Sequence, residues 1–130
     1  MFRITRITGV TGALACIAML GGCGPDAQIA QAEKSLAGKQ LTFAADIQPI
    51  VTARCQKCHV DDTKGKLSLG NLQSTMAGGK SGVDVVPGDA DKSRMYLLVA
   101  DKDKSKKIMP PKGDRLTPMQ IATINLPLYK

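Results

Sequence analysis

The chain places two cysteines and its only histidine within five residues, in the stretch CQKCH at residues 55–59. Three kinds of site use cysteine and histidine in this way: a zinc site, a redox-active thiol pair, and a covalently attached haem. Each kind needs different partners elsewhere in the chain. This stretch therefore constrains the fold more than any other feature of the sequence.

The zinc and thiol interpretations fit poorly. A structural zinc site needs four ligands, and the chain has no further histidine or cysteine after His59. A redox-active thiol pair normally opens a helix, whose N-terminus lowers the pKa of a thiol, whereas here the pair is expected to close one. A purely structural histidine is the simplest alternative, but its position directly after a thiol pair argues against it.

A covalently attached haem uses all three residues in their order. The thiols of Cys55 and Cys58 would add across the two vinyl groups of the porphyrin, and His59 would then supply the proximal ligand of the iron. The chain has no tryptophan, two tyrosines and two phenylalanines, so a small domain must find apolar volume elsewhere, and a haem would supply it. The sequence predicts one haem c.

Because His59 is the only histidine, a second histidine ligand would have to come from another chain, and the candidates for a second axial ligand within this chain are its methionines. Met95 and Met119 lie in expected helices, where a core role accounts for them, and Met76 precedes two glycines in a loop-rich stretch. Met109 is followed by two prolines, which restrict the backbone and lower the entropy lost in fixing its side chain. We expect Met109 to be the distal ligand, and a thioether raises the reduction potential of the iron.

Residues 1–22 have the features of an export signal. A basic start, MFRITR, precedes an apolar stretch that is too short to span a bilayer comfortably. The next residues, LGGC at 20–23, resemble the lipobox of bacterial lipoproteins, in which the cysteine is lipidated and becomes the new N-terminus. Cleavage after Ala32 is the alternative. Both predict export to the periplasmic side, and the first predicts a lipid anchor on Cys23.

The remaining chain divides into a tether and a domain. Residues 23–40 are small, polar and alanine-rich without a wide apolar face, which predicts a flexible tether. Residues 41–130 are expected to form the domain. Its first helix would carry Cys55 and Cys58 in its last turn, with Asp46 as the N-cap. The apolar residues of this helix share one face: Phe43, Ile47, Ile50 and Val51.

The rest of the domain is expected to be loops and helices. A short helical turn is predicted near residues 72–76, a helix over about 91–100 with Met95 inward, and a charged loop over 101–114. The last helix has Thr117 as a candidate N-cap, Pro118 at its first position and Gln120 completing a capping box. Pro127 is expected to stop this helix early.

Four stretches follow one another in the order typical of a known family: FAADIQPIVTARCQKCH, KGKLSLGNLQSTMAGGKSG, VVPGDADKSRMYLLV and KIMPPKGDRLTPMQIATI. They give a resemblance to the planctomycete-type cytochrome c domain and related small class I cytochromes, from Thr42 to about Ile124. The resemblance implies an all-α fold, a small cytochrome c-like helical bundle around one covalently bound haem c. It assigns Cys55 and Cys58 as haem thioethers, His59 as the proximal ligand and Met109 as the distal ligand. The family's last helix usually continues past a tryptophan, whereas this chain has NLPLYK.

Electron transfer, rather than enzymatic catalysis, is the expected function. No carboxylate pair, nucleophile or phosphate-binding loop stands out, and the net charge of +7 is too diffuse to indicate nucleic-acid binding. The alternative is a haem enzyme or a gas or redox sensor with an open distal site. Five lysines surround Met109 and are expected to dock redox protein partners that are acidic, unless the interspersed aspartates make this a solvated loop: Lys102, Lys104, Lys106, Lys107 and Lys112.

Overall fold

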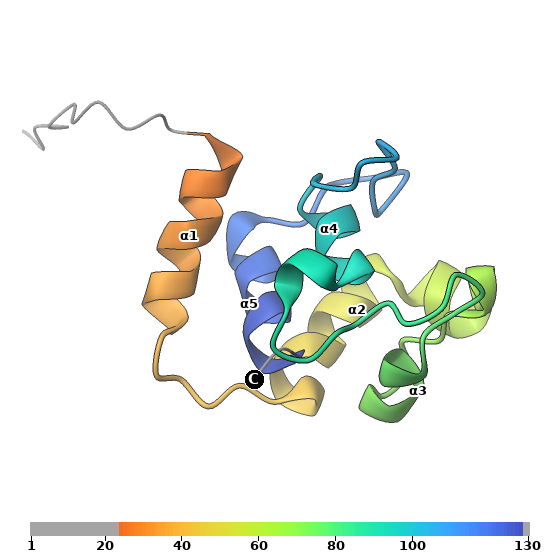
Figure 1. The fold of residues 1–130 in the computed structure, drawn as a ribbon. Helices are drawn as coiled ribbons and strands as arrows, with labels where there is room; N and C mark the ends of the chain where they lie inside the picture. The colour runs from red at the N-terminus through yellow and green to blue at the C-terminus, as the bar shows by residue number, and fades with distance from the viewer. Residues whose placement is uncertain (1–23, 129–130) are drawn as a thin grey trace, which may run out of the picture.

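The computed structural model of the protein describes residues 24–128, and every regular element in this range is a helix (Figure 1). No strand occurs between residues 24 and 128, where one isolated bridge joins Gly79 to Gly82. The prediction of an all-α fold is thus confirmed. The elements are α1 (Pro25–Leu36), η1 (Phe43–Ile47), α2 (Gln48–Arg54), η2 (Lys57–Asp61), η3 (Lys64–Lys66), α3 (Leu72–Ala77), η4 (Ala90–Lys92), α4 (Arg94–Val99) and α5 (Pro118–Leu128).

The export signal predicted for residues 1–22 and the candidate lipidation site Cys23 lie outside the described residues. Within residues 24–128, none of the helices combines the length and the apolar character that a membrane crossing requires.

The helical segment that leads to the cysteines begins at Thr42, four residues before the predicted cap. The hydroxyl of Thr42 accepts a hydrogen bond from the N–H of Ala45 at 3.2 Å. The carboxylate of Asp46 in turn accepts one from the N–H of Thr42 at 2.7 Å. Asp46 is therefore not the N-cap, because a π-helical turn, η1, precedes α2 and moves the cap to Thr42.

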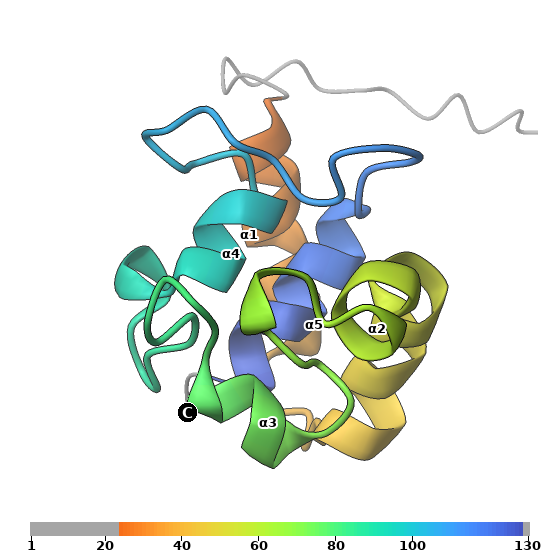
Figure 2. The same cartoon turned by 90° about the vertical axis from the view of Figure 1, so that its right-hand side faces the viewer.

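One main hydrophobic core draws on α1, η1, α2, α4 and α5 and on the loops between them. The helix pattern predicted inward positions for Ile47, Ile50 and Val51 and for Met95, and all four are buried. The core is therefore centred where α2, α4 and α5 meet (Figure 2). Its buried members are Ile29, Ile47, Ile50, Val51, Leu69, Val85, Met95, Tyr96, Val99, Leu116, Ile121 and Ile124.

The last helix, α5, starts as predicted and ends later than predicted. The N–H of Gln120 donates to the hydroxyl of Thr117 at 3.2 Å, and the N–H of Thr117 donates to Oε1 of Gln120 at 3.0 Å, which completes the capping box. The helix then runs through Pro127 to Leu128. Pro127 does not stop it early, because a proline in the last turn removes one backbone donor after most of the helix has formed.

The segment predicted to be a flexible tether contains an ordered helix instead. α1 lies beside α5 and packs against it (Figure 1). Ile29 belongs to the main core, while Ala32 and Leu36 form a second cluster with Ala122. The apolar face of α1 consists of a single row of residues, so the sequence pattern did not predict that this helix packs against the domain. Small side chains such as Ala32 let two helices approach closely, and α1 is thus integrated into the domain.

Candidate functional site

The CxxCH turn, residues 55–59, closes α2 and is held by local hydrogen bonds. The N–H of Cys55 donates to the carbonyl of Val51 at 2.8 Å, so Cys55 is the C-cap of α2. The N–H groups of Cys58 and His59 then both donate to the carbonyl of Cys55, at 3.1 and 2.9 Å. Cys58 and His59 thus lie in the following π-helical turn, η2, just beyond the last turn in which the sequence placed the cysteines.

A long-range bond holds the backbone at the histidine. The N–H of Leu69, whose side chain is buried in the core, donates to the carbonyl of His59 at 2.8 Å. The position of the imidazole is therefore tied to the core through the backbone as well as through the turn itself.

The two thiols of the turn are free and half-buried. Burial, followed by the proximity of Cys58, raises the pKa of Cys55 to about 11. A redox-active thiol needs a lowered pKa, since the thiolate is the nucleophile. The position at a helix C-terminus works in the same direction, because the dipole there disfavours a negative charge. The thiol oxidoreductase interpretation does not fit this site.

The imidazole of His59 contains a buried nitrogen, Nδ1, that has no hydrogen-bond partner. Leaving such an atom unsatisfied costs about 1–3 kcal/mol. Among residues 24–128, no three histidine, cysteine or acidic side chains come together as a metal-binding group, so a zinc site does not account for it. Two free thiols and an imidazole within one turn, in the order Cys-x-x-Cys-His, are the donor set of a covalently attached haem, with the thiols forming the thioethers and the imidazole free to bind iron.

The structure separates the four candidate methionines. Met95 is buried in the core, as expected. Met119 is 45% exposed, so the core role expected for it is wrong. Met76 and Met109 are both half-buried and pack on the same core cluster as Cys55. Met76 lies within α3, whereas Met109 lies in a loop and is tied to α4 by its N–H, which donates to the carbonyl of Leu98 at 3.1 Å.

An ion pair that the sequence did not suggest links the CxxCH turn to the segment that carries Met109. We call that segment, residues 101–114, the Met109 loop. Arg54 directly precedes Cys55, and its Nη1 lies 3.4 Å from Oδ2 of Asp114, at the end of the loop. Asp114 is largely exposed, so this pair is worth at most about 1 kcal/mol. The sequence alone could not predict this ion pair, because Arg54 has many acidic residues to choose from and only the fold brings Asp114 close to it.

The five lysines predicted to dock a partner are not equivalent. Lys102 points back into the protein, where its Nζ lies 3.1 Å from Oδ1 of Asp26 and 3.3 Å from the hydroxyl of Tyr96. The other four are exposed, and no ion pair within 4.0 Å joins them to an acid among residues 24–128: Lys104, Lys106, Lys107 and Lys112.

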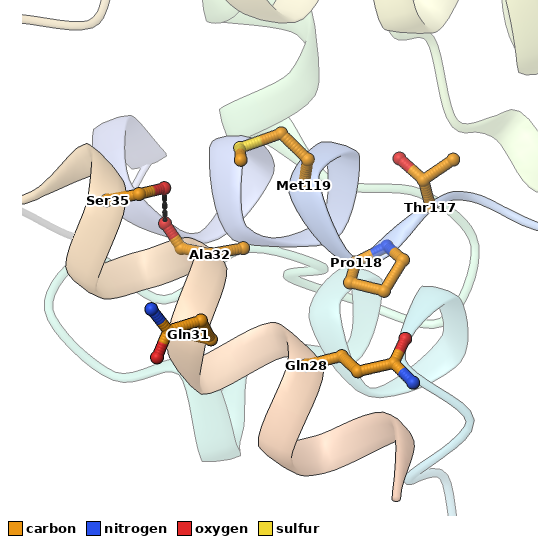
Figure 3. Close-up of a pocket in the computed structure, with 7 residues that line it drawn as sticks. All are labelled: Gln28, Gln31, Ala32, Ser35, Thr117, Pro118 and Met119. Atoms are coloured by element: carbon orange, nitrogen blue, oxygen red, sulfur yellow. Dashed lines mark hydrogen bonds between the residues drawn. The ribbon is translucent and has the colours of Figure 1, made fainter. Parts of the chain in front are cut away.

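A surface pocket of about 370 Å³ lies elsewhere, between α1 and the beginning of α5 (Figure 3). None of the predicted site residues lines it, and no charged side chain does. Its lining consists of Gln28, Gln31, Ala32, Ser35, Thr117, Pro118 and Met119. The pocket is therefore separate from the candidate haem site.

A small all-helical domain with a CxxCH turn at the end of a helix is the arrangement of a c-type cytochrome. Residues 55–113 match the family Planctomycete cytochrome C, and the match runs from Cys55 to the end of the Met109 loop. The match over residues 55–113 agrees with the predicted resemblance to the planctomycete cytochrome c domain, and this family implies covalently bound haem c. Searches of curated proteins and of solved structures found no match.

Proposed function

We propose that this protein is an electron-transfer cytochrome whose single haem is attached through Cys55 and Cys58 and ligated by His59 and Met109. The CxxCH turn, which presents two free thiols and the imidazole of His59 in the order that covalent haem attachment needs, is the observation that carries this proposal. The family match over residues 55–113 supports it.

The chain contributes attachment, ligation and rigidity. When bound, the haem supplies a one-electron couple between ferric and ferrous iron. The bond from Leu69 to the carbonyl of His59 and the bond from Met109 to the carbonyl of Leu98 hold the backbones of the two ligands. Ligands held in this way move little when the charge of the iron changes. With both axial positions filled by side chains, no position is left for a substrate, which favours an electron carrier over an enzyme.

The mass and the optical spectrum of the exported protein test this proposal. We expect the mass of one haem added to the chain, a weak near-infrared band in the ferric protein, which indicates methionine ligation, and slow binding of carbon monoxide to the ferrous protein. Rapid binding of carbon monoxide together with no near-infrared band would instead establish the open distal site of a haem enzyme or sensor. A mass without haem would exclude both.

We further propose that the protein is exported to the periplasmic side and anchored through a lipid on Cys23. The basic start, the apolar stretch and the LGGC sequence support this. The variant Cys23→Ser should move the protein from the membrane fraction to the soluble fraction while its haem content stays the same. Cys23→Ser protein that stays with the membrane would contradict the lipid anchor.

The four exposed lysines of the Met109 loop are proposed to dock an acidic redox partner, which would make the association fast and dependent on salt. Raising the ionic strength from about 0.01 M to about 0.15 M shortens the Debye length from about 30 Å to about 8 Å. We expect the second-order rate of electron transfer to the physiological partner to fall markedly over that range. A rate independent of salt would assign these lysines to a merely solvated loop.

A further inference from the structure

Lys102, at the start of the Met109 loop, is held by two separate helices, α1 and α4. Its Nζ forms an ion pair with Asp26 in the first turn of α1 and a hydrogen bond with the hydroxyl of Tyr96 in α4. The same Nζ lies 5.4 Å from the centre of the Tyr96 ring, within the range of a cation–π contact. Its backbone N–H donates to the carbonyl of Leu97 at 2.8 Å.

Lys102 and Met109 are attached to adjacent carbonyl groups. The N–H of Lys102 donates to Leu97 and the N–H of Met109 to Leu98, which are neighbours at the end of α4. The eight-residue stretch from Lys102 to Met109 therefore starts and ends on the same short piece of helix. A displacement of the first attachment is then carried to the second through a short, closed segment of chain.

The backbone directly before the first attachment and the backbone between the two attachments both have conformations that need support. Asp101 has φ of 62° and Lys106 has φ of 59°, both in the left-handed region. A residue other than glycine in that region is uncommon and costs about 1–3 kcal/mol, so it persists only where the surroundings hold it. The contacts of Lys102 are part of those surroundings.

The partner of Lys102 lies on an element that is itself firmly packed. Ile29 of α1 is 3% exposed in the main core, and Oε1 of Glu33 accepts a hydrogen bond from Asn125 of α5 at 2.7 Å. The first turn of α1 and the Met109 loop lie at the same end of the molecule (Figures 1 and 2). Asp26 thus offers Lys102 a fixed anchor rather than a free side chain on a tether.

We propose that α1 positions the Met109 loop, and that Lys102 is the positioning residue that connects them through Asp26 and Tyr96. This inference rests on the proposed function only in taking Met109 as a ligand. The contact itself stands on the distances above. Lys102 thereby serves the distal side of the site through its bonds to Asp26 and Tyr96, whereas the four docking lysines form no such ion pair within residues 24–128.

Hydrogen exchange of the complete haem-bearing protein tests the connection, with Lys102→Met as the main variant, because methionine keeps an apolar stem and removes the charge. Asp26→Asn removes the same ion pair from an exposed position and leaves the fold intact. Lys104→Met is the matched control, since Lys104 is an exposed lysine of the same loop. The readouts are the exchange rate of the amide of Met109, the exchange rate of the amide of His59, and the temperature at which the near-infrared band disappears.

We expect the amide of Met109 to exchange about two- to fivefold faster in Lys102→Met and in Asp26→Asn, which is the size of effect that a partly exposed ion pair gives. The amide of His59 and the control Lys104→Met should stay unchanged. The double variant should be no worse than the more affected single variant, because both substitutions break one contact. Equal acceleration at Met109 and His59, or no acceleration at Met109, would overturn the proposal.

These measurements distinguish a missing connection between α1 and the Met109 loop from a failure of the proposed function. If Met109 is not an iron ligand, the near-infrared band is missing in the unmodified protein. The exchange of the Met109 amide still reports on the connection between α1 and the loop in that case. If the connection is absent, the band is present in the unmodified protein and its loss temperature is the same in all variants.

Discussion

The two halves of the proposed haem site are built in different ways. The CxxCH turn is formed by hydrogen bonds between residues at most four apart, with one added bond from Leu69. The Met109 loop is held by contacts with α1, α2 and α4, through Asp26, Arg54 and Leu98. The conformation of the CxxCH turn therefore depends mainly on its own sequence, whereas that of the Met109 loop depends on how the domain packs. Substitutions should therefore affect the two halves separately.

The largest effect is expected from removing the covalent attachment. Cys55→Ala combined with Cys58→Ala should abolish covalent haem completely, because no other thiol lies in the turn, and the mass of the protein would show it. Gln56→Ala is the matched control, since Gln56 is exposed between the two cysteines. Covalent haem in the double variant would contradict the assignment of Cys55 and Cys58 as the attachment residues.

The next effect should be confined to the second half. Met109→Ala should keep the covalent haem and lose the near-infrared band, lower the reduction potential and open the ferrous iron to carbon monoxide. Met76→Ala is the control, because Met76 is also half-buried on the same core cluster. If Met76→Ala loses the band and Met109→Ala keeps it, the distal ligand has been assigned to the wrong methionine.

A moderate effect should come from α1. Ile29→Ala should destabilise the domain by about 2–4 kcal/mol, because Ile29 is 3% exposed and its removal leaves a cavity. Chemical denaturation followed by circular dichroism measures this. Gln28→Ala, next to it on an exposed face, should change stability by less than about 0.5 kcal/mol. If residues 23–40 are instead a flexible tether, the two variants will have equal stability.

The smallest effect should come from the ion pair that joins the two halves. Arg54→Met and Asp114→Asn should each lower stability by less than about 1 kcal/mol, because one partner is largely exposed. Their effect should shrink further at high salt. A double-mutant cycle across the two positions measures the coupling. A coupling of several kcal/mol would mean that the two halves are not independent.

The sequence predicted much of the fold because several helix ends are set by hydrogen bonds between residues that are close in sequence. The capping box of Thr117 and Gln120 needs only residues three apart, and it was confirmed. The inward face of α2 was predicted by spacing alone. The start of that helical segment was placed four residues too late, because Thr42 and Asp46 can both cap and only the formed turn chooses between them.

The predictions that failed depended on contacts between distant residues. α1 was expected to be a tether because its apolar stripe consists of Ile29, Ala32 and Leu36, which gain stability only when α5 lies beside them. Met119 was expected in the core and is 45% exposed on the side of α5 near α1. Lys102 was grouped with four other lysines, although it alone contacts Asp26 and Tyr96. No local pattern distinguishes these residues from their neighbours.

The proposed attachment half of the site can be read from local sequence, because two thiols and an imidazole at a fixed spacing are brought together by one tight turn. The support of the Met109 loop could be learned only from the packed domain. Its anchors lie on α1, α2 and α4, and the chain does not show which charge meets which until packing of the core brings these helices together.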